Sequence, residues 1–478
     1  MKISRRDYDV VVVGAGPNGL SAAILLQQNG INTLLIEGAS TIGGGMRSGA
    51  LTLPGFTHDI CSAIHPMAAG SPFFSTLPLK DFGLEFIYPI YAAAHPFSDG
   101  TATILETSIA GTASLLDDDC LSYTKLFSRL VSEWPLIASD VLGPLKVPHH
   151  PLAMFRYGSH ALLSANRFVH RYFKGEKAKS LFAGMAAHGM LPFSKAPSAA
   201  AGLTLMIHGH TTGWPMVKGG SQQLANALAS YFTSLGGEIQ TSFRVRSLKE
   251  LPGSQAVVLD VSPNQLLEIA GYKFSGLYKK QLSQYRYGMG VFKIDWALDA
   301  PIPFISEACR KAGTIHLGNS YAEIEMSEQL TAEGRHPEKP FVLLAQQSIF
   351  DPTRAPAEKH TAWAYCHVPQ GSLLDMRGAI EKQVERFAPG FRDSILSTHT
   401  MNTEKLEEYN PNNLGGSING GVQDLRQLFT RPALRFSPYK TTSKGIYICS
   451  ASTPPGGGVH GMCGYRAAQS VLRNIFKK

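Results

Sequence analysis

Apolar runs, glycine turns and helical spacing follow one another near the start of this chain. The four valines Val10–Val13 form an unbroken apolar run, which is typical of a strand covered on both faces in a parallel sheet. Glycines follow at once, then helical spacing from about Pro17 to Gln28, then a second apolar run in "INTLLIEG" (31–38). Strand, turn, helix and strand in this order predict a βαβ unit.

The turn of this unit has the spacing of a phosphate-binding loop. Gly14 permits the sharp turn, Gly16 removes a side chain where a pyrophosphate would approach, and Gly19 lets the helix pack close to the strand. The helix N-terminus at Pro17 offers free N–H groups and a partial positive charge. Glu37 ends the second strand, where a carboxylate can accept both hydroxyls of an adenosine ribose. The unit therefore predicts dinucleotide binding.

A second glycine cluster indicates which dinucleotide is bound. Gly43–Gly45 precede Arg47 in "GASTIGGGMRSG" and offer more amides, with a guanidinium, to a cofactor longer than NAD. A flexible surface loop is the alternative for this segment. The far end of the chain argues against that alternative, because "GIYICSASTPPGGGVHGMCGYRAAQSVLRNIF" (445–476) predicts another strand, turn and helix with amides exposed at Gly456–Gly458. Two glycine-rich segments so far apart in the chain suit a long cofactor that is held at both ends, and they favour FAD over NAD.

These motifs, together with "GWPMVKGGSQQLANALASYFTSLGGEI" (213–239), resemble a known family. They are similar to the FAD-dependent oxidoreductases related to phytoene desaturase and carotenoid isomerase, in particular a bacterial branch grouped with pyridine nucleotide-disulfide oxidoreductase domain protein 2. The resemblance implies an α/β fold in which a glutathione-reductase-like Rossmann FAD domain is interrupted by an α+β substrate domain with a mixed sheet. It implies that residues 1–75, 213–292 and 425–478 form the FAD domain, and residues 76–212 and 293–424 the substrate domain.

The resemblance also assigns cofactor contacts. Glu37 would bind the adenosine ribose, Val245 would touch adenine through its backbone, and His460 would lie at the flavin's pyrimidine edge, where it is the candidate catalytic residue. The full set of expected FAD contacts is Gly14, Gly16, Pro17, Gly19, Glu37, Gly44, Gly45, Met46, Arg47, Val245, Gly457, Gly458, Val459 and His460. Relatives often carry an acid after the last strand, whereas this chain has Ser450–Ala451. Backbone amides would have to replace that contact.

Length, cysteine usage and hydropathy narrow the class of protein. The chain has 478 residues, enough for two or three domains with buried cores. Its six cysteines are scattered without a CxxC pair, so neither a metal site nor a redox disulfide is indicated and a cytoplasmic location is expected. "MKISRR" resembles the start of a signal peptide, but Gly14 interrupts the apolar run, so we interpret it as mature protein. No apolar stretch is long enough to span a bilayer.

The net charge of +8 raises the question of an acidic partner. Cations gather between residues 156 and 179 and mix with apolar residues at helical spacing, so one interpretation is a basic amphipathic helix within 156–182 that makes peripheral contact with the inner face of a membrane. The alternative, which we favour, is a solvated helix face whose apolar side packs in the substrate domain. Nucleic acid is not an expected partner, because no recognition motif accompanies the charge.

The candidate chemistry follows from the flavin. FAD would accept a hydride, and a desaturase needs little more than a long apolar cavity beside the ring. No second GxGxxG follows a strand, so oxygen, a quinone or another carrier is the expected electron acceptor. Further candidates are the histidines at 188, 208, 210 and 367, the polar glycine loop Asn412–Gly421, and Arg354 as an anion contact.

Three hypotheses about function are open. The first is an FAD oxidoreductase that dehydrogenates or isomerises a small apolar substrate, a polyene or lipid. The second is a flavin amine oxidase, which would want an aromatic cage and usually a lysine near the reactive nitrogen; Trp214, Tyr365 and Tyr439 exist, but their spacing does not pair them. The third is a flavoprotein with structural FAD that binds a partner.

Overall fold

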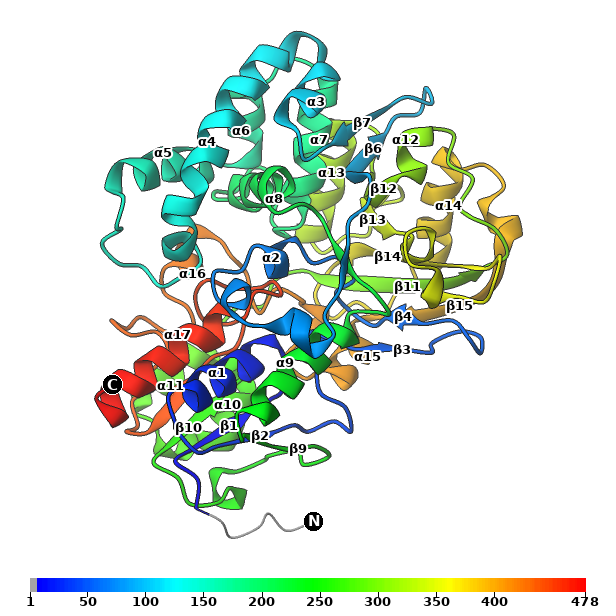
Figure 1. Cartoon of the computed structure of the whole chain (residues 1–478). Coiled ribbons are helices and arrows are strands. Elements are labelled where there is room, and N and C mark those ends of the chain that lie inside the picture. The colour runs from blue at the N-terminus through cyan, green and yellow to red at the C-terminus, as the bar shows by residue number, and fades with distance from the viewer. Residues whose placement is uncertain (1–6) are drawn as a thin grey trace.

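Two sheets organise the protein (Figure 1). The computed structural model describes residues 7–478, so the basic start of the chain, "MKISRR", lies outside the described residues and its interpretation is not tested. The α/β class expected from the sequence is confirmed, and the two sheets differ in kind: one is parallel and the other is mixed.

The parallel sheet has five strands in the order β16-β10-β1-β2-β9. Counted from the β9 edge to the β16 edge, these are the third, second, first, fourth and fifth strands of the sheet in chain order. This is the strand order of a dinucleotide-binding Rossmann sheet. Its strands are β1 (Val10–Val13), β2 (Thr33–Ile36), β9 (Glu238–Gln240), β10 (Ala256–Leu259) and β16 (Ile446–Ile448). A ligand-binding crevice is expected beyond the carboxyl ends of β1 and β10, because the strand order reverses between these two strands.

Helices cover both faces of this sheet, because alternate residues of its strands join different apolar clusters. Val10 and Val12 pack with α1 (Pro17–Gln28), α9 (Gln222–Ser234) and α17 (Met462–Val471). Val11 and Val13 pack with α10 (Pro263–Ala270) and α11 (Gly276–Ser283). A segment from early in the chain and one from late in it meet here, since α1 and α17 lie side by side (Figure 1).

The seven-stranded sheet has the order β15-β11-β14-β13-β12-β6-β7. Only β12 and β6 pair in parallel among its strands, and the other pairs are antiparallel. The strands are β6 (Tyr91–Pro96), β7 (Ala102–Leu105), β11 (Gly290–Leu298), β12 (Ala312–Leu317), β13 (Val342–Ala345), β14 (His360–Val368) and β15 (Ile395–Met401). The predicted strands "GTIHLG", "FVLLAQQS" and "TAWAYCHV" are β12, β13 and β14, whose apolar and aromatic residues fill its core.

A helical layer packs on one face of this mixed sheet, at the top of Figure 1. It consists of α3 (Ile109–Ser114), α4 (Cys120–Val141), α5 (Pro151–Ala161), α6 (Ala165–Tyr172), α7 (Glu176–Ala187), α8 (Ala199–Thr211) and α13 (Tyr321–Ala332). On the opposite face lie α12 (Glu307–Arg310) and α14 (Arg377–Phe387). Short elements connect the layers. The helices among them are α2 (Pro66–Ala69), α15 (Thr403–Tyr409) and α16 (Leu425–Leu428). The strands pair as β3 (Ser48–Gly49) with β4 (His58–Asp59) and as β5 (Phe86–Ile87) with β8 (Met216–Val217).

The basic segment within 156–182 is not one amphipathic helix. The end of α5, then α6 and α7 divide it, with Phe173–Gly175 between the last two. Phe168, Val169 and Leu181 are buried in the helical layer, while the cations Arg167, Arg171 and Lys174 are exposed. The apolar sides of α6 and α7 therefore already have a partner, and the interpretation of a solvated helix face is the one that fits this arrangement.

The chain passes between the two sheets several times. All strands of the parallel sheet come from residues 1–75, 213–292 and 425–478, and β11 of the mixed sheet begins at Gly290, just before the expected boundary. The division into two domains stays a prediction. No helix among residues 7–478 is both long and apolar enough to cross a membrane.

Candidate functional site

A cavity of about 530 Å³ lies between the two sheets, beyond the carboxyl ends of β1 and β10. We call it the cofactor cavity. One end is lined by Glu37 and Val245, the middle by the glycine turns, and the far end by side chains of the mixed sheet such as Tyr365. This is the crevice in which open α/β sheets bind their ligands.

The middle of the cavity is a cradle of bare backbone. Gly14 has φ +98°, a conformation that favours glycine, and a Cβ on Gly44 would lie 3.0 Å from the Cα of Gly16. A Cβ on Gly19 would come 1.7 Å from the carbonyl oxygen of Gly14, so α1 can only approach β1 with glycine here. The α1 N-terminus opens onto this space, and the cradle therefore fits a pyrophosphate.

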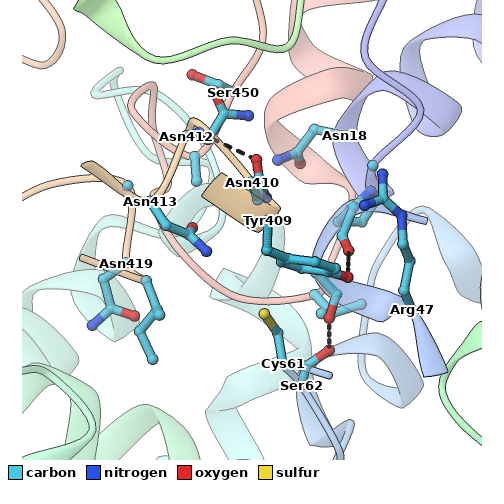
Figure 2. A pocket seen from close by; sticks show the side chains of 18 of the residues that line it. Asn18, Arg47, Cys61, Ser62, Tyr409, Asn410, Asn412, Asn413, Asn419 and Ser450 are labelled. Carbon is cyan, nitrogen blue, oxygen red and sulfur yellow. Dashed lines mark hydrogen bonds between the residues drawn. The ribbon is translucent and has the colours of Figure 1, made fainter. Parts of the chain in front are cut away.

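Glu37 lies at one end of the cavity, and hydrogen bonds fix its carboxylate. Its Oε2 accepts a hydrogen bond from the amide of Ala15 (2.8 Å), and its Oε1 accepts from the amide of Ala39 (2.9 Å) and from Arg47 Nη2 (3.1 Å). The Arg47 guanidinium also stacks on the ring of Tyr409, 5.2 Å from its centroid (Figure 2). These contacts hold the carboxylate at the cavity wall.

The polar glycine loop also reaches this cavity. Asn412, Asn413, Asn419 and Gly420 all line it, and Figure 2 labels the three asparagines among the lining side chains. The loop is anchored because Asn412 Oδ1 accepts from the amide of Ser262 (2.7 Å) and its Nδ2 donates to the carbonyl of Asp260 (3.1 Å). The loop therefore lies at the cofactor cavity, and its place relative to the flavin stays a prediction.

Asp260 is a site residue that the sequence reasoning missed. It follows β10, is buried, and its Oδ2 accepts a hydrogen bond from the amide of Gly19 at 3.0 Å. Burial raises the pKa of Asp260 to about 7, and the Glu37 charge adds to the rise while the Gly19 amide opposes it. An acid directly after an apolar strand, in "VVLDVSP", was the available signal.

The structure separates the expected FAD contacts into three groups. The cofactor cavity is lined by Gly14, Gly16, Pro17, Glu37, Gly44, Gly45, Arg47, Val245, Gly458 and Val459. Gly19 and Met46 lie behind it, Gly19 against the turn and Met46 fully buried in the apolar cluster of α1. Gly457 and His460 line a second cavity, which also touches Gly458.

His460 is buried and faces away from the cofactor cavity. Its Nδ1 accepts a hydrogen bond from the amide of Met462 (3.0 Å), and its backbone carbonyl accepts from the Ser71 hydroxyl (2.6 Å). Burial lowers the pKa of His460 to about 4, so the imidazole is neutral near pH 7. These contacts describe a residue that orders the glycine turn; its catalytic role stays a prediction.

The other candidate residues from the sequence also differ in whether they line a cavity. His188 lines both cavities, with its Nε2 3.0 Å from His316 Nε2, and burial lowers its pKa to about 3. His208, His210 and His367 line neither cavity. Arg354 lies in neither wall, because its Nη2 is paired with Asp59 Oδ2 at 2.6 Å in a buried contact.

The mixed sheet supplies the wall opposite the glycine turns. Lys293 of β11 and Tyr365 of β14 are direct cross-strand partners, and both line the cofactor cavity with Trp363. Lys293 is buried and forms an ion pair with Asp295. The Trp363 and Tyr365 rings pack edge to face with centroids 5.2 Å apart. The sequence reasoning missed Lys293 and Trp363.

Trp214 completes this wall, and Tyr439 does not belong to it. The Trp214 indole donates to Thr314 Oγ1 (2.8 Å) beside the cavity. The Tyr439 hydroxyl instead donates to the carbonyl of Pro454 (3.0 Å). Two of the three aromatic residues singled out from the sequence are thus brought together.

The second cavity has a volume of about 1360 Å³ and adjoins the first. We call it the apolar cavity. It runs between α5, α8 and the segment that follows α16, and its lining is mostly leucine, alanine, proline, methionine and phenylalanine. The two cavities share Met67, His188, Leu205, Asn419 and Gly458. No group of His, Cys, Asp or Glu that could hold a metal ion occurs within residues 7–478.

Comparison with known proteins agrees with this geometry. Residues 18–266 match the family described as flavin containing amine oxidoreductase. The chain is 26% identical to pyridine nucleotide-disulfide oxidoreductase domain-containing protein 2 of Rattus norvegicus, over 98% of this chain and 94% of that protein. It is 23% identical to a lycopene-forming phytoene desaturase of a Paracoccus species, over 97% and 96% of the two chains.

Solved structures with the same fold cover almost the whole chain. An oxidoreductase of Methanosarcina mazei superposes with a TM-score of 0.66 at 15% identity, covering 98% of this chain and all of that one (100%). Putrescine oxidase bound to putrescine superposes with a TM-score of 0.63 at 17% identity, covering 99% and 100%. The resemblance to phytoene desaturase-related FAD oxidoreductases is confirmed. The chain belongs to the flavin containing amine oxidoreductases and is an FAD-dependent oxidoreductase.

Proposed function

We propose that this protein dehydrogenates or isomerises an apolar, polyene-like or lipid-like substrate at the flavin of FAD. The observation that carries the proposal is the apolar cavity of about 1360 Å³, which adjoins the cofactor cavity at His188, Leu205 and Gly458. A lining of this kind suits a hydrocarbon chain, because burying its surface is favourable and few polar groups need partners.

We propose a matching place for the cofactor, on a glutathione-reductase-like Rossmann domain. The adenosine would lie at Glu37 and Val245, the pyrophosphate against Gly14 and Gly16, and the ring toward the mixed sheet near Lys293. The order of the five parallel strands and the glycine cradle support this placement. FAD supplies the hydride acceptor when it is bound.

The chain's own residues would position the substrate and exclude water. Trp363 and Tyr365 offer a rigid aromatic wall, and Leu205 stands where the two cavities meet. His188 lies at the same junction as a neutral imidazole, since burial holds its pKa far below 7. This imidazole therefore presents no charge to an apolar substrate beside the flavin, and its lowered pKa makes it a weak proton acceptor.

Anaerobic reduction of the flavin tests the proposal. Polyenes, unsaturated lipids and amines are added in turn to the FAD-loaded protein, and bleaching near 450 nm is followed after rapid mixing, as in other flavoproteins. Leu205→Trp should slow bleaching by long apolar substrates by about tenfold or more, because it fills the junction. Leu277→Trp, at an exposed position outside both cavities, is the control and should leave the rate unchanged. Bleaching by amines alone would contradict the proposal.

A flavin amine oxidase is the second candidate, and Lys293 favours it. The buried lysine lies opposite the glycine turns, with Trp214, Trp363 and Tyr365 in the same cavity wall. If amines are the substrates, Lys293→Met should lower the rate of flavin reduction by amines about a hundredfold while FAD stays bound. With an apolar hydrocarbon as the substrate, the same variant should change the rate less than about tenfold.

We propose oxygen, a quinone or another carrier as the electron acceptor. Direct measurement of reoxidation tests these acceptors. The reduced protein is mixed with air-saturated buffer or with a soluble quinone in the absence of oxygen. Reoxidation by only one of the two identifies the acceptor class.

A further inference from the structure

The outer end of the apolar cavity is ringed by large apolar side chains that face solvent. We call this set the apolar rim; it consists of Leu145, Phe155, Leu162, Phe429, Leu434 and Phe436. Leu145 is 77% exposed, Phe155 72% and Leu434 70%, and Phe436 is fully exposed. Single exposed apolar residues are ordinary on protein surfaces, but a cluster around one opening indicates an interaction site.

The rim comes from two separate parts of the chain that converge on the same cavity. Leu145 lies between α4 and α5, while Phe155 is on α5 itself. Phe429, Leu434 and Phe436 follow α16, more than two hundred residues further along. Figure 1 shows α5 and α16 on the same side of the molecule. The rim residues therefore border one cavity, although they come from two distant parts of the chain.

Charge distinguishes the segments that carry the rim. Residues 141–175 contain five Lys or Arg residues and no Asp or Glu, and two of these cations, Lys146 and Arg156, are ion-paired. Residues 425–444 also contain five Lys or Arg residues and no Asp or Glu, and one of them, Arg431, is buried. The acids that flank these segments are already engaged, since Asp140 pairs with Lys146 (2.8 Å) and Asp424 with Arg286 (2.8 Å). Arg426 and Lys444 are exposed and have no ion pair within the described part of the chain.

We propose that the apolar rim docks on the surface of a bilayer that contains anionic lipids, so that the apolar cavity opens toward the membrane interior. Phe155, Phe429 and Phe436 would insert among the acyl chains while the surrounding cations contact the lipid headgroups. A second copy of this chain is a poorer occupant, because two rims of the same positive charge repel each other.

This docking surface differs from the helix expected within 156–182, which it meets at Leu162 and at the cations of that segment. The apolar side chains of α6 and α7 are buried in the protein, whereas those of the rim are exposed. The inference deepens the proposed function, because it names the source of an apolar substrate. Vesicle binding is nevertheless measured without turnover, so its failure and the failure of the proposed reaction are distinguishable.

Flotation of the FAD-loaded, full-length protein with vesicles tests the inference. Vesicles of phosphatidylcholine alone are compared with vesicles that also contain phosphatidylglycerol, at low and high salt. Binding should be stronger to the anionic vesicles and should weaken with salt, because the screening length falls from about 8 Å at physiological ionic strength to about 3 Å at 1 M. The double variant Phe155→Ser/Phe436→Ser should lose at least about tenfold in vesicle affinity.

The matched control is Leu277→Ser/Leu373→Ser, which removes two exposed leucines outside the rim and should bind vesicles like the natural protein. Flavin content and melting temperature show that each variant is folded. Failure of the natural protein to float with anionic vesicles would overturn the inference, and so would equal flotation of the rim variant. A dimer in solution that the rim variant disperses would assign the rim to a second copy and also overturn it.

Discussion

FAD binding should weaken as the pH rises above about 7, because of Asp260. The proposed pyrophosphate position at Gly16 is next to this carboxyl: a Cβ on Gly16 would lie 3.2 Å from Asp260 Oδ2. Burial and the charge of Glu37 together raise the pKa of Asp260 from 3.8 to about 7, against the opposing hydrogen bond from the Gly19 amide. The two thiols that face it, Cys449 and Cys463, are neutral because burial raises their pKa values as well. A neutral Asp260 tolerates a pyrophosphate, and an ionised one repels it.

The size of the effect follows from the protonation equilibrium. Where binding requires the protonated carboxyl, the apparent Kd rises in proportion to 1 + 10^(pH − pKa), so with a pKa of about 7 a rise of about five- to sixfold is expected between pH 7 and 8. The cofactor-free protein should show the same linkage in its stability. A pKa raised on folding stabilises the protein fully below about 3.8, and this contribution is lost as the pH rises toward 7. The loss is about 4 kcal/mol at most, from roughly three pKa units.

The assay is a titration of the FAD-free protein with FAD, followed by flavin fluorescence at about pH 6, 7 and 8. Asp260→Asn keeps an acceptor for the Gly19 amide but cannot ionise, so its Kd should be independent of pH over this range. Asp81→Asn, at an exposed position, is the control and should keep the pH dependence of the natural protein. A natural protein whose Kd does not change with pH, or an Asp260→Asn variant with an unchanged slope, would refute the reasoning.

Two further predictions concern the packing behind the site. Gly464→Ala should destabilise the protein by about 2 kcal/mol or more and lower its FAD content, because the new Cβ would lie 1.7 Å from the carbonyl oxygen of Asn18 and force α17 away from α1. Gly378→Ala, at a helical position with open space around it, is the control and should be neutral or slightly stabilising in the same calorimetric measurement. Arg431→Met should lower stability by on the order of 3 kcal/mol and reduce FAD occupancy, since buried Arg431 Nη2 donates to the carbonyls of Gly420 (3.2 Å) and Ala451 (3.0 Å). Calorimetry and the ratio of flavin to protein absorbance measure both effects, and an Arg431→Met protein with unchanged melting and occupancy would contradict the second prediction.

The elements that the sequence predicts well are those whose pattern is local. Val10–Val13 and the helix Pro17–Gln28 have the predicted bounds, because an apolar run cut by Gly14 leaves the chain few alternatives. The strand around "TAWAYCHV" is β14, whose nine residues His360–Val368 carry the aromatic content typical of a sheet. The segment 156–182 shows the limit of such reasoning, because whether an apolar helix face is buried depends on the layer around it.

The parts of the candidate site also differ in how well the sequence predicts them. Its glycine turns can be predicted from spacing, since each turn is made within a few residues and its geometry demands glycine. The wall formed by Lys293, Trp363 and Tyr365 depends on the pairing of β11 with β14, and the apolar cavity depends on segments before α5 and after α16. Those pairings are set by packing between distant segments, and no local pattern records them.

Lys293 nevertheless leaves a trace in the sequence. All nine residues of β11 are buried, and its alternate residues face different clusters: Val291 lies toward the cofactor cavity, and Phe292 and Ile294 toward the opposite core. Strand alternation then puts Lys293 and Asp295 on the side of the cavity. Burying a charged pair is costly unless its partners are well placed, and replacing it with apolar residues is often neutral or favourable. Two charges on one face of an otherwise apolar strand, as in "GVFKIDWAL", therefore indicate a functional wall and single out β11 as the strand that faces the flavin in the proposed arrangement.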